Sequence, residues 1–333
     1  MGNLYPLLML PRFDPRPWGT EDLSPIYPNH KFEEKIGEAW LSGDDSKVAN
    51  GPLTGKTLAQ LSELYQGELV GEAARDSVRF PLLLKFLFPH EKLSVQVHPD
   101  DAQALRVGQP WGKTECWYIA HAQTGAQIAL GLKPGVSAQQ LEEAIHQKRA
   151  EEVLNWINVY AGDMIYVAGG TVHTLGPGSV VVETQQQSDT TYRLYDYGRP
   201  RELHLKDGLA AVKEKARSGK VVRPAPEQMG RSKNRRAPLV AAPYFVVEMF
   251  EAKDPLELAT QDGSGKSSVQ ILVAVEGCGV IEATGADPVT FAKGDAVVVP
   301  ASVGKFGLRP QWTLEFLRAY VPGQSLPEPE TRM

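Results

Sequence analysis

Cysteine is scarce in this sequence: there are two residues, Cys116 and Cys278, in a chain of 333. So few cysteines exclude the disulfide-rich scaffolds of small secreted domains. Each lies within an apolar run typical of a strand, which predicts a buried free thiol. We therefore expect the protein to work in a reducing compartment, the cytoplasm.

An excess of positive charge is also missing, because 35 basic residues face 40 acidic ones and leave a net charge of −5. The field of the whole chain would not attract nucleic acid, and an anionic ligand would need a local cluster of Arg or Lys. No apolar run approaches the roughly 18 residues of a membrane-spanning helix. The apolar start of the chain is interrupted by Pro6 and lacks basic residues, so neither a signal peptide nor an anchor is expected. We expect no nucleic-acid or membrane partner.

Glycine and proline are plentiful, at 31 and 25 residues, which favours short strands and turns over long helices. Helical spacing of apolar residues occurs in three stretches, 57–66, 137–157 and 202–217. Ser137, with Gln140 three residues later, resembles a capping box. The apolar run 80–88 predicts a buried strand, in which Lys85 either reaches an edge or faces a polar interior.

A Pro-rich basic segment, residues 223–236, is interpreted as a linker, and the length of the chain suggests about two domains. Short segments with strand character follow it, separated by Gly, Asp and Pro, as in an all-β sandwich or barrel. We expect a first domain over residues 1–235, with helical insertions near 137–157 and 202–217, and a second over 236–333.

Four polar residues are candidates for a metal site. Gln96 and His98 lie two apart in an alternating segment, so on a strand both face the same side. Glu115 opens a second strand-like run that could pair with the first. His173 follows a Gly-Gly turn, and alone it would more often be structural. Together they offer two imidazoles, a carboxylate and an amide, a mixed set that zinc accepts.

The segments 161–173 and 293–304 look alike, since each has a Gly-Asp turn, four strand residues, a break and a short loop. Two copies of one motif suggest two barrels of one design. No histidine occurs after His204, so only the first copy is expected to bind metal.

The Gly-Asp-strand-turn-His pattern resembles the second motif of the cupin superfamily of antiparallel β-barrels. Four segments closely resemble the type I mannose-6-phosphate isomerases in their shorter bacterial form: Ser94–Asp101, Gly112–Ile119, Gly170–Gly176 and Ser188–Tyr197. The resemblance runs from Tyr5 to about Val321, with Ala168 where the cupin pattern usually has Pro. It implies a mainly β fold of two cupin-type jelly-roll barrels, with a small helical insertion in the first.

The resemblance implies one Zn²⁺ per chain and a phosphosugar substrate, mannose 6-phosphate, interconverted with fructose 6-phosphate through a cis-enediol. The family places an active-site arginine at Arg193, where a guanidinium would stabilise negative charge on the enediolate. Asp189 would orient it or transfer a proton, or else form a simple ion pair. The proton could equally be carried by Glu183, His98 or a metal-bound water.

The same resemblance places a phosphate contact at Arg199, with Lys113 and Ser94 as further candidates. Lys113 is also expected to act in catalysis. Trp18 and Glu38 would complete the wall of the site. The sequence is compatible with a monomer or a homodimer.

Two other readings fit the same motifs. A non-catalytic sugar-binding cupin would be marked by loss of Arg193 or of a ligand, and neither is lost here. An iron-dependent cupin dioxygenase would more often have His where Gln96 stands, since such iron sites favour two His and a carboxylate.

Overall fold

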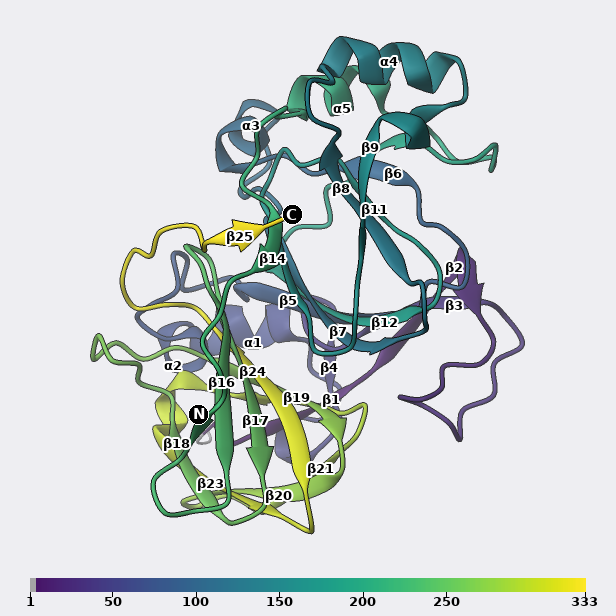
Figure 1. Cartoon of the computed structure of the whole chain (residues 1–333). Helices are drawn as coiled ribbons and strands as arrows, with labels where there is room; N and C mark the ends of the chain where they lie inside the picture. The colour runs from purple at the N-terminus through teal and green to yellow at the C-terminus, as the bar shows by residue number, and fades with distance from the viewer. Residues whose placement is uncertain (1–3) are drawn as a thin grey trace.

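The computed structural model describes residues 4–333 and contains four sheets arranged as two units, one above the other in Figure 1. Every strand pairing in the described chain is antiparallel. The protein is thus mainly β with antiparallel sheets, as the sequence predicts. None of the described helices is long and apolar enough to cross a membrane.

The first unit stacks an eight-stranded sheet on a five-stranded one. The larger sheet has the order β2 (Arg12–Thr20), β3 (Ile36–Trp40), β5 (Leu82–Leu87), β12 (Ser179–Gln186), β7 (Glu115–Ala122), β10 (Met164–Val167), β14 (Gly219–Val221) and β25 (Thr331–Arg332). The smaller has β13 (Tyr192–Tyr195), β6 (Val95–Val97), β11 (His173–Leu175), β8 (Gln127–Leu132) and β9 (Leu154–Asn158). Trp117, Ile119 and Ile165 of the larger sheet pack with Ile128 and Leu175 of the smaller in one buried cluster.

The second unit repeats this plan with an eight-stranded and a four-stranded sheet. The larger has the order β15 (Glu227–Gln228), β16 (Arg235–Ala241), β17 (Val246–Ala252), β24 (Leu314–Tyr320), β19 (Gln270–Glu276), β22 (Ala296–Val299), β1 (Leu7–Leu10) and β4 (Lys47–Val48). The smaller has β18 (Leu256–Ala259), β23 (Lys305–Pro310), β20 (Cys278–Ala283) and β21 (Val289–Ala292). Phe250 and Phe316 stack between the two sheets, with ring centroids 5.0 Å apart.

The two larger sheets also share a core. Leu84, Phe86 and Tyr166 of the first unit belong to the same buried cluster as Ile271 and Val298 of the second. The central strands of both large sheets are therefore buried on both faces, which explains their almost continuously apolar sequences.

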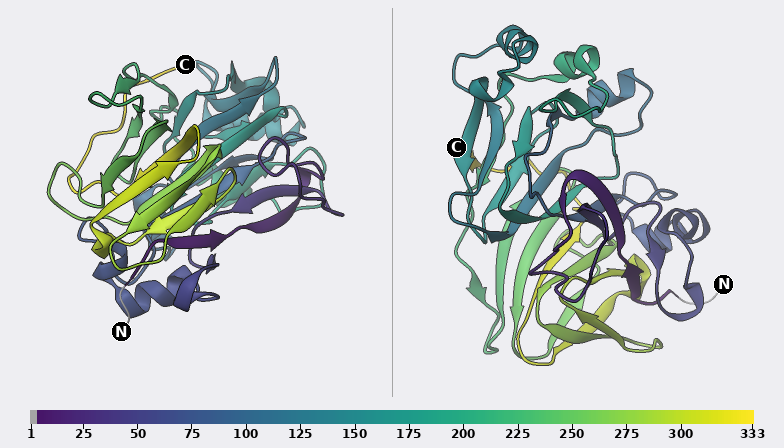
Figure 2. Two further views of the ribbon diagram at one scale, coloured as in Figure 1. Left: turned by 90° about the horizontal axis from the view of Figure 1, so that it is seen from below. Right: turned by 90° about the vertical axis from the view of Figure 1, so that its right-hand side faces the viewer.

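The N-terminal segment crosses between the units. Strand β1 pairs with β22, with Leu7 opposite Val298, so the purple start of the chain lies beside the green strands of the second unit (Figure 2). At the other end of the chain, β25 pairs with β14 of the first unit. Each unit is thus completed by residues from the other end of the sequence.

The helices are short, and those labelled α3, α4 and α5 lie at the end of the first unit drawn uppermost in Figure 1. The α-helices are α1 (Leu58–Tyr65), α2 (Gly67–Val70), α3 (Asp101–Arg106), α4 (Ala138–His146) and α5 (Leu205–Ala211), and the 3₁₀ turns are η1 (Gly51–Leu53), η2 (Ala150–Val153) and η3 (Ala301–Val303). Apolar residues of α4 and α5 pack with Val95 and Val97 of β6. These helices brace the strand that carries Gln96.

Most sequence expectations for single elements are confirmed. The helix expected over 57–66 is α1, and the capping box at Ser137 starts α4. The helix expected over 202–217 is the shorter α5. The two Gly-Asp repeats precede β10 and β22, which hold corresponding positions in the two large sheets.

Three expectations are wrong. The second half of the helix expected over 137–157 is η2 and β9, because Leu154 to Asn158 pair along β8. The strand opened by Glu115 does not pair with that of Gln96, since β7 and β6 lie in different sheets. Cys116 is buried as expected, whereas Cys278 is half-exposed.

Candidate functional site

The first unit contains a buried His-Glu-His cluster between its two sheets. Glu115, on the large sheet, lies near His173, on the small sheet, and near His98, which directly follows β6 of that sheet. The His98 Nε2 atom lies 3.4 Å from Glu115 Oε2, and His173 Nε2 lies 3.5 Å from Glu115 Oε1. One ligand atom from each residue falls within 4.8 Å of the others. This spacing suits a single metal ion.

Backbone carbonyls fix both imidazoles. His98 Nδ1 lies 3.0 Å from the Thr190 oxygen, and His173 Nδ1 lies 2.9 Å from the Thr171 oxygen. When each Nδ1–H donates to its carbonyl, each Nε2 lone pair faces Glu115, the usual outer-shell arrangement of metal-binding histidines. Burial lowers the pKa of His173 to about 4 and that of His98 well below its ordinary value. Both rings are therefore neutral at neutral pH, as metal ligands must be.

The ammonium of Lys113 lies beside the cluster and supplies positive charge next to the Glu115 carboxylate. Its Nζ donates to Glu115 Oε2 at 2.7 Å and lies 2.9 Å from His98 Nε2. Burial disfavours its charge, but Glu115 and Glu183 outweigh burial and raise its pKa. Glu115 Oε1 is buried without a hydrogen-bond partner in the described chain. A carboxylate oxygen with no donor, beside two imidazole lone pairs, fits a divalent cation.

Gln96, in the middle of β6, lies beside the His-Glu-His cluster. Its Nε2 lies 3.2 Å from His173 Nε2, and Ser94 Oγ donates to its Oε1 at 3.2 Å. Because an amide's oxygen and nitrogen can exchange places by a half-turn, Gln96 can present Oε1 to the same point as the imidazoles. In the sheet it stands directly opposite His173 on one side and Arg193 on the other. Gln96 thus stands between His173 and Arg193 in the ladder of the small sheet.

A cavity of about 470 Å³ opens above the cluster. Its charged lining residues are Arg16, Glu38, Lys85, Lys113, Glu183, Asp189, Arg193 and Arg201, so five basic side chains face three acidic ones. Ser94, Gln96, Trp18 and Thr191 also line it. This local positive excess can hold an anion in a chain whose net charge is negative.

Lys85 faces this polar interior. Of the two possibilities that its sequence left open, an edge or a polar interior, the second is correct. Its side chain is only 3% exposed, and its Nζ lies 4.1 Å from the centre of the Trp40 ring. Asp189 Oδ1 lies 3.5 Å away, and carboxylate oxygens of Glu38 and Glu183 each lie 3.9 Å away. Three carboxylates around one ammonium hold this wall of the cavity together.

Glu38 and Glu183 share this wall but differ in their surroundings. Glu38 accepts hydrogen bonds from Arg16 and Trp40, and although burial opposes it, the charges of Lys85 and Arg16 lower its pKa to about 2. Glu183 accepts one from Trp117 at 3.0 Å, and burial and then Glu115 raise its pKa. Glu38 is therefore a fixed charge, and Glu183 is the more readily protonated of the two.

Arg193 reaches the cavity from β13. Its guanidinium donates through Nη1 to the Glu202 carbonyl at 2.9 Å, while its Nε is buried without a partner among residues 4–333. A buried donor with no acceptor is costly, and a bound oxyanion would satisfy it. Burial and then Arg201 lower its pKa, but a guanidinium stays charged at neutral pH.

The structure does not place Arg199 on the cavity. Its guanidinium instead bonds to Glu91, Asp196 and the Lys92 carbonyl. Arg201, two residues later, lines the cavity and is held by two 2.7 Å hydrogen bonds to Asp196.

Arg201, Arg16 and Thr191 line the cavity but were not predicted from the sequence, and the direction of Lys85 was left open. Arg16 and Arg201 stand in Pro-containing segments without strand spacing, where the direction of a side chain cannot be predicted. The sequence around Lys85 did contain an indication. A charged residue inside an apolar strand that is buried on both faces must point toward a polar interior.

Comparison with known proteins agrees with this site. Residues 19–111 match the model of the phosphomannose isomerase type I catalytic domain. Mannose-6-phosphate isomerase ManA of Bacillus subtilis is 34% identical over 322 residues, covering 91% of this chain and 95% of that protein. The relative of Streptococcus mutans, a mannose-6-phosphate isomerase, is 33% identical and covers 90% and 93%.

Solved structures have the same fold. The mannose 6-phosphate isomerase of Bacillus subtilis superposes with a TM-score of 0.82 at 33% identity, over 94% of this chain and 99% of that one. A zinc-bound mannose 6-phosphate isomerase with 15% identity shares the fold, with a TM-score of 0.73 over 95% and 99% of the two chains. From this site and these relatives, the chain belongs to the type I mannose-6-phosphate isomerase family.

Proposed function

We propose that this protein interconverts mannose 6-phosphate and fructose 6-phosphate with the help of one zinc ion. The observation that carries the proposal is the His98–Glu115–His173 cluster lying under a basic cavity that also contains Gln96 and Arg193. Its full-length relatives bear the name of this activity.

Zinc is the proposed metal because its preferred ligands are present. Gln96, His98, Glu115 and His173 would hold it, and it would act as a Lewis acid on the sugar carbonyl. The amide in place of a third imidazole favours a non-redox metal.

The reaction removes a proton from one sugar carbon and returns it to the neighbour through a cis-enediol. Arg193 stabilises the enediolate oxygen, because its side chain lines the cavity and its guanidinium stays charged at neutral pH. Two carboxylates without an Arg partner can carry the proton, Glu183 and Asp189. The raised pKa of Glu183 brings it nearer the operating pH of a general base, and Asp189 stands at the more exposed rim.

The phosphate is held by basic side chains away from the metal. Arg201, and not Arg199, is the proposed phosphate contact. Asp196 accepts hydrogen bonds from its Nε and Nη2, which orients the guanidinium and leaves Nη1 available. Lys85 and Ser94 lie on the same cavity and supply further donors, and Trp18 and Glu38 form its wall.

We also propose a catalytic domain over residues 1–235 and a cupin-like domain without metal over 236–333, each pair of stacked sheets forming one cupin barrel. Strand β1 is then an arm of the first domain that pairs with the second. The cytoplasm is the proposed compartment, and two free thiols are compatible with it.

The test is a coupled assay for fructose 6-phosphate on protein stripped of metal and reloaded. We expect activity to vanish on stripping and to return with zinc. Full turnover in excess chelator would refute the role of the metal. Oxygen consumption by the iron-loaded protein, without isomerisation, would favour a dioxygenase, and tight sugar binding without turnover would favour a binding protein.

A further inference from the structure

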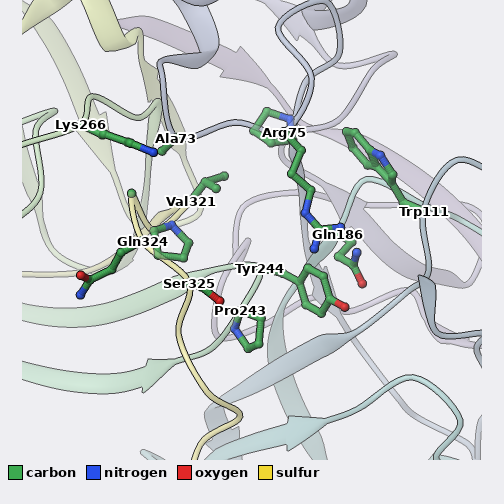
Figure 3. A pocket seen from close by; sticks show the side chains of 13 residues that line it. Ala73, Arg75, Trp111, Gln186, Pro243, Tyr244, Lys266, Val321, Gln324 and Ser325 are labelled. Atoms are coloured by element: carbon green, nitrogen blue, oxygen red, sulfur yellow. The ribbon is translucent and has the colours of Figure 1, made fainter. Parts of the chain in front are cut away.

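A second pocket, of about 330 Å³, lies at the junction of the two units, apart from the metal site (Figure 3). The first unit contributes Arg75, Trp111 and Gln186. The second contributes Tyr244, from the turn between β16 and β17, and Lys266, from the loop between β18 and β19. Such volumes are at the lower end of small-molecule sites, which often form between domains.

The lining combines positive charge with aromatic and apolar surface. The Arg75 guanidinium lies 4.9 Å from the centre of the Tyr244 ring, and Arg75 Nη1 donates to Asp101 Oδ2 at 2.6 Å. Lys266 enters from the side opposite Arg75 in Figure 3 and keeps an exposed ammonium. Val321 and prolines complete the apolar part. An anionic group would meet Lys266, and a flat ring would lie against Tyr244 or Trp111.

Hydrogen bonds connect this pocket to the metal-binding strand. Asp101 Oδ1 accepts from Gln186 Nε2 at 2.9 Å and from the Gly112 N–H at 3.0 Å. The buried amide of Gln186 in turn accepts from the Thr114 N–H through Oε1 at 2.9 Å. Thr114 lies between Lys113 and Glu115. A ligand that moves Arg75 and Asp101 therefore acts on the segment that positions two residues of the site.

We propose that this pocket binds a small phosphate monoester carrying a flat ring, and that its occupancy changes the kinetics of the isomerase. Binding does not depend on the proposed activity, whereas the kinetic effect rests on it. The two parts are tested separately, so their failures are distinguishable.

The binding test is calorimetric titration of the full chain with phenyl phosphate and with adenosine 5′-monophosphate. Lys266→Glu should weaken binding by about tenfold or more, while Lys305→Glu, an equal charge change on an exposed strand of the second unit, should not. Arg193→Ala should leave it intact, because that residue lines the other cavity. No saturable binding of either probe, or equal binding by Lys266→Glu, would overturn the proposal, and so would loss of binding in Arg193→Ala.

The kinetic test is the isomerase assay at saturating probe. We expect a several-fold change in kcat or KM in the wild type and none in Lys266→Glu, whose activity without probe should be normal. Competitive inhibition that survives in Lys266→Glu would place the probe in the metal-site cavity and overturn the coupling. Unchanged kinetics at proven saturation would overturn it too.

Discussion

Gln96 is the proposed ligand that distinguishes this metal site from one with three imidazoles. It stands in register between His173 and Arg193, and its amide Nε2 lies 3.2 Å from His173 Nε2, so it links the His-Glu-His cluster to the strand that carries Arg193. Its neighbours Val95 and Val97 are buried against the helices on the outer face of the sheet. Alternation along β6 therefore fixes the amide toward the cavity.

Replacing Gln96 by His should change the metal preference of the site. A third imidazole makes the ligand set more favourable to redox metals. We expect a rise in bound iron relative to zinc in purified protein and a loss of isomerase activity on the order of 10–100-fold. Metal analysis and the coupled assay measure both, with Gln96→Glu as a variant of similar size. Unchanged metal content and activity in Gln96→His would show that Gln96 is no ligand.

Arg193→Ala should lower kcat by about 10²–10³-fold, the usual effect of removing one donor to a transition-state oxyanion. In the described chain its side chain makes one hydrogen bond, from Nη1 to the exposed Glu202 carbonyl, and its Nε has no partner, so a small loss of folding stability is expected. KM should change less than kcat, and the thermal midpoint should remain close to that of the wild type. A variant with normal kcat would remove Arg193 from the mechanism.

Acid should destabilise the metal-free protein through its buried imidazoles. Burial holds the pKa of His173 at about 4, whereas an unfolded histidine titrates near 6.5. Above about pH 6.5 both states are neutral and the stability is fully present. Between about pH 6.5 and 4 the unfolded state binds a proton that the folded state does not, so the free energy of unfolding falls. Thermal midpoints measured across this range should fall more steeply for the wild type than for His173→Asn.

The residues predicted as metal ligands could be picked out because the pattern of strands and turns carries them, and His98, Glu115 and His173 do lie together. Gln96, His98 and His173 each follow from alternation or from a turn. The phosphate contact was placed two residues away from the residue that lines the cavity. Arg199 and Arg201 lie on the same irregular loop, where ion pairing with Asp196 and Glu91 decides which one turns inward. Such competition between partners far apart in sequence cannot be read from spacing.

At the level of elements, local signals predicted where helices start better than where they end. The capping boxes of α1 and α4 satisfy exposed N–H groups by contacts within four residues, which a sequence displays directly. The end of α4 and the start of β9 depend on pairing with β8, a tertiary contact. The short α3 is not among the three helices predicted from the sequence, although Asp100 and Gln103 form a third capping box at its start.

Thr57→Ala should destabilise the protein by about 1 kcal/mol, because it removes the acceptor for the Gln60 N–H at the start of α1. Urea unfolding curves give the difference in the free energy of unfolding. Thr57→Ser keeps the hydroxyl and should lose only a few tenths of a kcal/mol. Equal losses in both variants would mean that the methyl group, not the cap, is responsible.

Over the whole molecule, two units of one plan pack by their large sheets, and the chain ends are exchanged between them. The internal repeat predicted the common plan, since β10 and β22 correspond. It did not predict that β1 joins the second unit, because Leu7 pairs with Val298, which lies far away in the sequence and in a segment without similarity to β1. The motif beside β22 retains the turn but has no histidines, in agreement with a structural role for this unit.

Leu7→Ala should reveal how strongly β1 ties the units together. Leu7 is fully buried in their shared core, so a loss of about 2–5 kcal/mol is expected on urea unfolding. Leu10, on the same strand, is 56% exposed, and Leu10→Ala should cost little. If the two variants unfold alike, the core contribution of β1 is negligible.

During synthesis, β1 must wait for its partner strand β22 to be made. It leaves the ribosome before its partner β22, which follows after roughly 290 residues, a delay on the order of 15–60 s at about 5–20 residues per second. For that interval β1 can pair only with the two-residue strand β4, where Met9 stands opposite Val48, while most of the first unit can already form. Variants with a slower elongation rate should therefore depend more on chaperones that cover nascent N-termini.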